Sequence, residues 1–362
     1  MTVAARSTPS ARAALFASRL PELEQMARRI LRGGWRAPLL DGQLKTALEQ
    51  AAYERLLRAT GSFLTELPLS QLRYGHESCE HLLPSPAMWT KAARVAKRLG
   101  LEFGAVLPPT YASREPEVLA TLERLDALAS ELGRPIEVTA ADWGTVALVR
   151  EWEGLVPSLG RIMNRMKRFE RWSRERPQAN ISGLAGLIGL RGLDRPESST
   201  QEDPIQGDEP QGELNSDEII GAQVAMFQRS PLDSEATHAL GADAGVARHE
   251  YDPVPQGVAP PSGQGALMPV AVHAPWTYVT QGRRCVTRTL IEGPGVRHAA
   301  PCAASCRSHL VLSDYREEKN GPLSMEALVQ KGNAVYMENT RFLRLLPPAL
   351  RERALWVVTP LL

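Results

Sequence analysis

The stretch that decides the fold is LEFGAVLPPTYASREPEVLATLERLDALASELGRPIEVTA, residues 101–140. Its first apolar run, Phe103 to Leu107, is short and predicts a strand. The segment from Glu115 to Leu132 keeps the apolar spacing of an amphipathic helix, and Ile136 to Thr139 predicts the next strand. A strand, a helix and a second strand at this spacing indicate a parallel α/β sheet or barrel.

The same alternation continues on both sides of this stretch. Upstream, Leu72 to Tyr74 predicts a strand, and the helix that follows it is expected at Pro86 to Leu99. Downstream, a short helix is expected near Thr145 to Trp152 and a strand at Leu155 to Ile162. We therefore assign residues 65–193 to the first part of an α/β sheet or barrel.

The pattern returns in the last third of the chain, so residues 219–362 are expected to form the second part of the same domain. Strands are expected at Ile219 to Phe227 and at Leu267 to His273. The elements expected to close the architecture are two strands and a helix, at Leu310 to Asp314, Ala334 to Met337 and Pro347 to Ala354.

Two segments fall outside this alternation. Residues 11–60 carry apolar side chains at helical spacing, so residues 1–64 are expected to be an N-terminal helical extension. Between Asp194 and Glu218 the chain has nine acidic residues against Arg195 alone, and no aromatic residue. Such a segment cannot bury enough apolar surface to offset its ordering entropy, so residues 194–218 are expected to be a disordered acidic insertion.

The composition argues against several classes of protein. With 42 Lys plus Arg against 41 Asp plus Glu, the net charge is +1, so no overall field attracts the chain to nucleic acid or to an anionic membrane. The longest apolar stretch, Ile181 to Leu190, has ten residues, whereas a membrane span needs about 20. Four cysteines in 362 residues favour a reducing compartment, so a cytoplasmic location is expected. The basic N-terminus also fits a mitochondrial transit peptide, which is the less favoured alternative.

The four cysteines, Cys79, Cys285, Cys302 and Cys306, are candidates for a metal centre. Each is flanked by polar or turn residues, and none lies in an obvious amphipathic core stripe. Four thiolates are the ligand set of a tetrahedral zinc site or of a 4Fe-4S cluster. Zinc sites usually show two short cysteine pairs, whereas this chain has one, so iron-sulfur is favoured over zinc. Four unrelated thiols are the remaining interpretation.

Three motifs carry a resemblance to a known family. They are Tyr74-Gly75-His76-Glu77-Ser78-Cys79, Glu137-Val138-Thr139-Ala140-Ala141-Asp142-Trp143-Gly144, and Tyr278-Val279-Thr280-Gln281-Gly282-Arg283-Arg284-Cys285 with the later Cys302-x3-Cys306 pair. Together they resemble the U32 collagenase-like peptidase superfamily, and within it the UbiU/UbiV branch, which acts in oxygen-independent ubiquinone hydroxylation. The acidic insertion, the N-terminal helices and the gap of 16 residues between Cys285 and Cys302 depart from the family pattern.

The resemblance implies a fold, a cofactor and a reaction. The fold would be a TIM-type α/β barrel with irregularities. Cys79 matches the early ligand of a 4Fe-4S cluster, Cys285 the second, and Cys302 and Cys306 the final pair. The implied activity is that of a hydroxylase subunit that works with a UbiU-like homologous subunit and a redox partner. Its substrate would be an aromatic or prenylated-aromatic compound, with prephenate as the oxygen donor.

Other functions stay open beside this one. One is an RNA-modifying hydroxylase subunit of the same superfamily, which the near-neutral charge does not favour. Another is a non-catalytic zinc or iron-sulfur scaffold. Peptidase activity is not expected, because the sequence offers no credible set of nucleophile, base and orienting residue.

Three acidic or histidine side chains are placed where barrel enzymes carry their chemistry, at the ends of predicted strands. His76 and Glu77 lie beside Cys79, where they would either support this ligand or take part in catalysis. Asp142 follows the strand at Ile136 to Thr139, where it would either act in the site or cap the next helix.

Two arginines are candidates to bind a carboxylate, because the planar guanidinium matches that group. For Arg165 the favoured alternative is a solvated basic face. Arg284 precedes Cys285, so it is also placed to tune the cluster by lowering the pKa of the thiolate ligands.

Overall fold

Eight short strands form the framework of the molecule. The structure, a computed structural model, describes residues 11–164 except 41, 43 and 45, and then residues 225, 227–263, 268–282, 285–293, 302–307, 309–313 and 328–360. The eight strands are β1 (Arg12–Ala17), β2 (Leu69–Gly75), β3 (Glu102–Val106), β4 (Ile136–Ala140), β5 (Leu155–Leu159), β6 (His249–Tyr251), β7 (Val270–Ala274) and β12 (Leu355–Val358).

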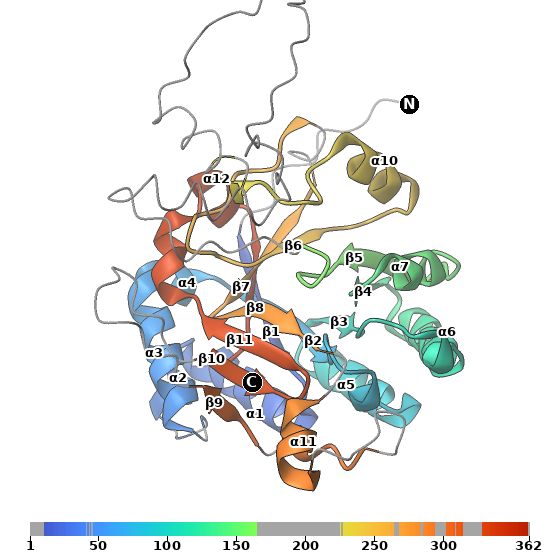
Figure 1. The fold of residues 1–362 in the computed structure, drawn as a ribbon, viewed down its shortest axis with the longest axis horizontal. Helices are drawn as coiled ribbons and strands as arrows, with labels where there is room; N and C mark the ends of the chain where they lie inside the picture. Colours follow the sequence, from blue (N-terminus) through green and yellow to red (C-terminus); the bar gives the residue numbers. More distant parts are fainter. Residues whose placement is uncertain are drawn as a thin grey trace, which may run out of the picture.

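These strands pair in parallel and close into one barrel (Figure 1), in the order β1-β12-β7-β6-β5-β4-β3-β2. The predicted TIM-type α/β barrel is therefore confirmed. Helices alternate with the first strands and lie outside them in Figure 1: α5 (Pro86–Arg98), α6 (Glu115–Leu132) and α7 (Trp143–Val149). A further helix, α10 (Glu235–Asp243), precedes β6.

Helix α6 illustrates why these segments are helical. It begins with Glu115, Pro116 and Glu117, and proline and acidic residues both favour the first turn of a helix. Its apolar side chains, such as Leu122 and Leu125, are buried in the main core. It ends at Gly133, whose φ of 68° is a left-handed conformation that glycine adopts without strain.

The strands place successive side chains on opposite sides of the barrel wall. In β4, Ile136 and Val138 belong to the large apolar core, in which side chains of the strands pack against the surrounding helices. Glu137 and Thr139 point into the barrel, where both contact Arg73 of β2. This period of two is the geometry of a strand, and it separates an apolar outer layer from a partly charged interior.

The prediction of helix over residues 11–60 is wrong at its start, because β1 is a barrel strand paired with both β2 and β12. Its sequence, RAALFA, is buried on both sides, so it shows a continuous apolar run rather than alternation. The N-terminal segment is thus part of the barrel rather than an extension of it. Helices follow as predicted, namely α1 (Leu20–Gly33), α2 (Ala37–Leu40), α3 (Ala47–Thr60) and α4 (Ser62–Glu66).

A second sheet interrupts the barrel between β7 and β12. Its strands are β8 (Trp276–Gln281), β9 (Val311–Ser313), β10 (Leu328–Lys331) and β11 (Ala334–Glu338), and they pair in antiparallel fashion in the order β8-β11-β10-β9. The strands predicted at Leu310 to Asp314 and Ala334 to Met337 were expected to close the barrel. They belong to this second sheet instead, so that expectation is wrong. The two-residue turn of Gly332 and Asn333 can join only antiparallel neighbours, and β12 closes the barrel instead.

Short helices complete the connections. They are η1 (Glu80–Leu82), η2 (Ala112–Arg114), α11 (Val286–Glu292), η4 (Ser305–Arg307), η5 (Thr340–Leu345) and α12 (Pro348–Arg351). No helix among the described residues is both long enough and apolar enough to cross a bilayer.

Several predictions concern residues that the structure does not describe. The expected acidic insertion at 194–218 lies outside the described residues, as do Arg165 and Arg284. Of the strand expected at Ile219 to Phe227, Ala225 and Phe227 are described and both are helical, so that prediction is wrong at these positions. The sixth strand is β6 instead, which has only three residues and a charged centre at Glu250, too short and too polar for an apolar pattern to reveal.

Candidate metal centre at the barrel mouth

The four cysteines lie on two connections that both leave the barrel at the carboxyl ends of its strands. Cys79 is four residues beyond the end of β2. Cys285, Cys302 and Cys306 all belong to the long connection between β7 and β12. Loops at this end of a TIM barrel form its active sites.

The fold brings these four thiols into one neighbourhood. Cys306 donates a hydrogen bond to Cys285. Cys79 and Cys306 are both buried in one small cluster with Leu82. The charges of Cys285 and Cys302 act on both Cys79 and Cys306, which places Cys302 close to the other three. The chain is therefore folded so that a residue near position 80 meets residues near position 300.

The turn between β10 and β11 holds the cysteine-bearing segments together. The side chain of Asn333 donates to the carbonyl of Ser78, next to Cys79, at 2.8 Å. The carbonyl of Gly332 accepts from the amide of Val286, next to Cys285, at 3.1 Å. Gly332 has a left-handed φ of 64°, and a Cβ built on it would touch Sγ of Cys306 at 3.5 Å. Two adjacent residues thus position three of the four thiols.

The environment of each thiol differs. The hydrogen bond from Cys306 lowers the pKa of Cys285 and raises that of Cys306. Backbone amides support two sulfurs, since Arg288 N lies 3.3 Å from Sγ of Cys285 and Ala304 N lies 3.4 Å from Sγ of Cys302. Burial raises the pKa of Cys79 to about 11.

Thiolates are the ligands of both structural zinc sites and iron-sulfur clusters. All four cysteines are free thiols rather than disulfides. In the part of the chain that the structure describes, no three Cys, His, Asp or Glu side chains are arranged to hold one metal ion. A 4Fe-4S cluster is held by four thiolates, one on each iron. Amides donating to sulfur are also a feature by which proteins tune such clusters.

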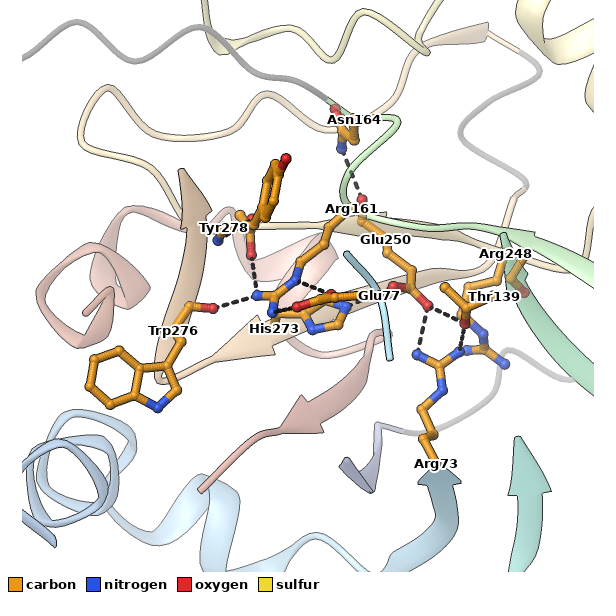
Figure 2. Close-up of polar contacts among 12 residues, drawn as sticks. Arg73, Glu77, Thr139, Arg161, Asn164, Arg248, Glu250, His273, Trp276 and Tyr278 are labelled. Atoms are coloured by element: carbon orange, nitrogen blue, oxygen red, sulfur yellow. Dashed lines mark hydrogen bonds and ion pairs between the residues drawn. The ribbon is translucent and has the colours of Figure 1, made fainter. Parts of the chain in front are cut away.

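Beside the cysteines, a cluster of ion pairs fills the mouth of the barrel (Figure 2). Arg161 follows β5 and is 1 % exposed. Its guanidinium donates to both carboxylate oxygens of Glu77, at 2.8 and 2.5 Å, and to Asp252 at 3.0 Å. Asp252 also accepts from the amide of Tyr278 in β8, at 2.9 Å. The hydroxyl of Tyr336 in β11 donates to Glu77 at 3.1 Å, so the antiparallel sheet is tied to the barrel mouth.

A second group of ion pairs lies deeper in the barrel. Arg73 of β2 donates to Glu250 of β6 at 2.6 Å (Figure 2). It also donates to Glu137 of β4 at 2.9 Å. Nε2 of His273 in β7 lies 2.8 Å from the other oxygen of Glu250. Gly104 of β3 leaves room for these side chains, because a Cβ there would lie 3.2 Å from Nε2 of Gln71 and 3.4 Å from Cγ of Arg73.

The paired arginines keep these buried carboxylates ionised. Burial alone would raise the pKa of Glu137, but Arg248 and Arg73 outweigh it and lower the pKa to about 2. Burial acts in the same way on Glu77 and Glu250, and the attached Arg161 and Arg73 hold the pKa of each below its usual range. The barrel interior is therefore a network of charges on opposite strands.

A small cavity of about 30 Å³ opens between the barrel mouth and the antiparallel sheet. It is lined by Phe16, Ala17, Ser18, His76, Glu77, Lys331, Tyr336 and Thr359, which come from the ends of β1, β2 and β12 and from β10 and β11. Lys331 and His76 are both 6 % exposed. Burial lowers the pKa of Lys331 to about 8 and that of His76 to about 3.

The residues that the sequence predicted for the site have different structural roles. His76 supports the Cys79 segment, since its Nδ1 accepts from the amide of Cys79 at 3.1 Å. Glu77 joins the ion pair with Arg161. Asp142 caps α7, because it accepts from Thr145 N at 2.7 Å, and it also accepts from Thr110 N at 2.8 Å. A structural role for Asp142 accounts for all of these contacts.

Sequence reasoning missed Arg73, Glu250, Asp252 and Lys331. A signal existed for Arg73 alone, which stands between Leu72 and Tyr74 in the middle of a short predicted strand. A charge at that position of a barrel strand points inward and needs a partner.

Comparisons of this chain with models of protein families, with curated proteins and with solved structures find no match.

Proposed function

We propose that the chain binds a 4Fe-4S cluster through Cys79, Cys285, Cys302 and Cys306 and acts as a subunit of an oxygen-independent hydroxylase. The observation that carries this proposal is the convergence of the four thiols at the mouth of a parallel barrel. Cysteines scattered by chance over residues 79 to 306 would not be expected to meet at the one end of the barrel where TIM enzymes act.

A bound cluster would supply electron transfer or activation of a substrate. The residues of this chain would do the rest. The amides of Arg288 and Ala304 would donate to two ligand sulfurs, and His76 would hold the loop of Cys79 through its Nδ1. The turn of Gly332 and Asn333 would hold the segment of Cys79 and the segment of Cys285 next to each other.

The hydroxylase reaction is proposed from the resemblance to the UbiU/UbiV branch. The substrate would then be an aromatic or prenylated-aromatic compound, with prephenate as the oxygen donor, and the chain would work in the cytoplasm with a UbiU-like homologous subunit and a redox partner. The net charge of +1 favours a small molecule over RNA as the substrate.

The cofactor is tested on protein purified without oxygen. We expect the broad visible absorption of an iron-sulfur cluster and about four iron and four sulfide ions per chain. Cys302→Ala and Cys306→Ala should both lose iron and sulfide. Ser78→Ala is the matched control, because Ser78 neighbours a ligand and keeps its backbone contact with Asn333. Full iron content in both cysteine variants would refute the cluster, and a colourless protein holding zinc would support the scaffold alternative.

The reaction is tested in cells grown without oxygen. Deletion of the gene should abolish one hydroxylated product, and the native gene should restore it. The Cys79→Ala form should not restore it. Equal rescue by both forms would show that the cysteine site is not needed, and the hydroxylase proposal would then be abandoned.

A further inference from the structure

Lys331 is a buried cation without an ion pair in the part of the chain that the structure describes. It is the last residue of β10, it is 6 % exposed, and it lines the cavity at the barrel mouth. No carboxylate of the described residues lies within 4 Å of its ammonium group. Lysine is almost never buried unless it is paired, so its partner is expected to be a ligand.

Two other donors line the same cavity. Nδ1 of His76 accepts from the amides of Ser78 and Cys79, at 3.3 and 3.1 Å, so the proton of the neutral ring lies on Nε2. Thr359 follows β12 and is 4 % exposed, and its hydroxyl has no hydrogen-bond partner among the described residues. A buried hydroxyl without a partner is costly in a folded protein and indicates a missing acceptor.

The charges around the cavity favour an anion. The carboxylate that lines it, Glu77, is already bound by Arg161 and Tyr336. A second cation, Arg19, is close enough to Lys331 to lower its pKa. Glu49, Cys306 and Glu22 each act in the opposite direction and more weakly, and neither carboxylate lies within ion-pair distance of Lys331. The groups left to meet a ligand are therefore an ammonium, a ring N–H and a hydroxyl.

We propose that this cavity is a binding site for a small oxyanion, with Lys331, His76 and Thr359 as its donors. The oxyanion is the carboxylate of an organic ligand or a free inorganic anion. One water needs about 10–15 Å³ of such space, so a cavity of about 30 Å³ admits the two oxygens of a carboxylate but not an aromatic ring. The rest of an organic ligand would extend out of the cavity. The site stands on the cavity alone and does not require the cluster.

The experiment measures the binding of sodium acetate and sodium sulfate to the full chain by calorimetry, at constant ionic strength. Four variants are compared with the native protein. Lys331→Met removes the charge and Lys331→Arg keeps it. Thr359→Val removes only the hydroxyl. Lys91→Met is the matched control, because Lys91 lies in a separate basic groove along α5 and does not line the cavity.

We expect Lys331→Met to weaken binding at least about tenfold, and Thr359→Val to weaken it about threefold. Lys331→Arg and Lys91→Met should bind within about twofold of the native protein, because both keep the cavity cation. Tighter binding of acetate would identify an organic carboxylate as the ligand, and tighter binding of sulfate would identify an inorganic anion.

Three results would overturn the proposal: no binding of either anion to the native protein, native affinity in Lys331→Met, or equal losses in Lys331→Met and Lys91→Met. Thr359→Val keeps the test decisive if Lys331→Met does not fold, and native affinity in that variant would also refute the donor set. Iron content is measured in parallel. Anion binding by protein that cannot hold iron would refute the cluster and leave this site standing.

Discussion

The two faces of the barrel strands are built from different interactions. On β2, Leu72 points outward and Arg73 points inward, and both are essentially buried, at 0 % and 1 % exposure. Leu72 belongs to an apolar core shared with the helices, whereas Arg73 is bonded to Glu250 and Glu137 on other strands. The two side chains are equally buried but are stabilised differently. Leu72 is held by dispersion and the hydrophobic effect, whereas Arg73 is held by directed ion pairs.

This difference determines what each face tolerates. Apolar contacts have no fixed direction, so a side chain of similar volume can replace another at low cost. An ion pair in the interior requires both partners, because a buried carboxylate that loses its arginine keeps its desolvation cost without compensation. The interior is therefore expected to be the more easily damaged of the two faces.

The largest effect is expected for Arg73→Met, compared with Leu72→Met at the adjacent position. The first variant leaves Glu250 and Glu137 short of a cation and should lower the free energy of unfolding by about 3–5 kcal/mol. The second conserves volume in an apolar site and should cost less than about 1.5 kcal/mol. Urea unfolding followed by circular dichroism measures both. Equal losses would show that the interior ion pairs are not special.

Arg73→Lys sharpens the comparison by keeping the charge. Arg73 reaches Glu250 through one terminal nitrogen and Glu137 and Thr139 through the other. A lysine ammonium cannot span these acceptors as the planar fork does, so we expect a loss of about 2 kcal/mol. The same urea unfolding applies, and a lysine variant as stable as the native protein would mean that charge alone is enough.

A smaller effect on stability is expected from His249, which precedes Glu250 in β6 and points out of the barrel. Burial, together with the nearby His238, lowers the pKa of His249 from its ordinary value of about 6.5 to about 4. Between these values the unfolded chain binds a proton that the folded chain does not, so stability falls as the pH falls. The slope from this residue should be about 1.4 kcal/mol per pH unit.

His249→Gln removes this titration, so between pH 6 and pH 4.5, both inside the window set by the pKa shift, the variant should lose less stability than the native protein. Thermal unfolding at several pH values measures the difference between the two slopes. If the stability of the native protein and of His249→Gln changed equally with pH, the proton bound on unfolding would not belong to His249.

The outer layer could largely be predicted from the sequence. Helix α6 has the predicted bounds, and α5 and β3 differ from prediction by one residue at their ends. These segments are amphipathic or continuously apolar, and periodicity reports that property. Strand β1 was missed because its alanine-rich run suits a helix equally well, and only pairing with β2 and β12 decides the matter.

The interior and the site could be predicted only in part. The four cysteines could be named from their flanking residues, but nothing local shows that Asn333 bonds to Ser78 or that Gly332 packs on Cys306. Arg73 and Glu250 are 177 positions apart, and their pairing exists only once the barrel closes. Lys331 is the last residue of β10, whose alternation of buried and partly exposed side chains is that of any half-exposed strand.

Whether Cys79 shares one metal centre with the late cysteines can be measured in a single comparison. Native protein and Cys79→Ala are loaded with iron and sulfide under anoxic conditions, and the bound ions are counted. The native chain should bind about four of each, and the variant should lose most of them together with the visible absorption. A Cys79→Ala protein that binds iron and sulfide as fully as the native chain would contradict a site shared between the two ends of the barrel.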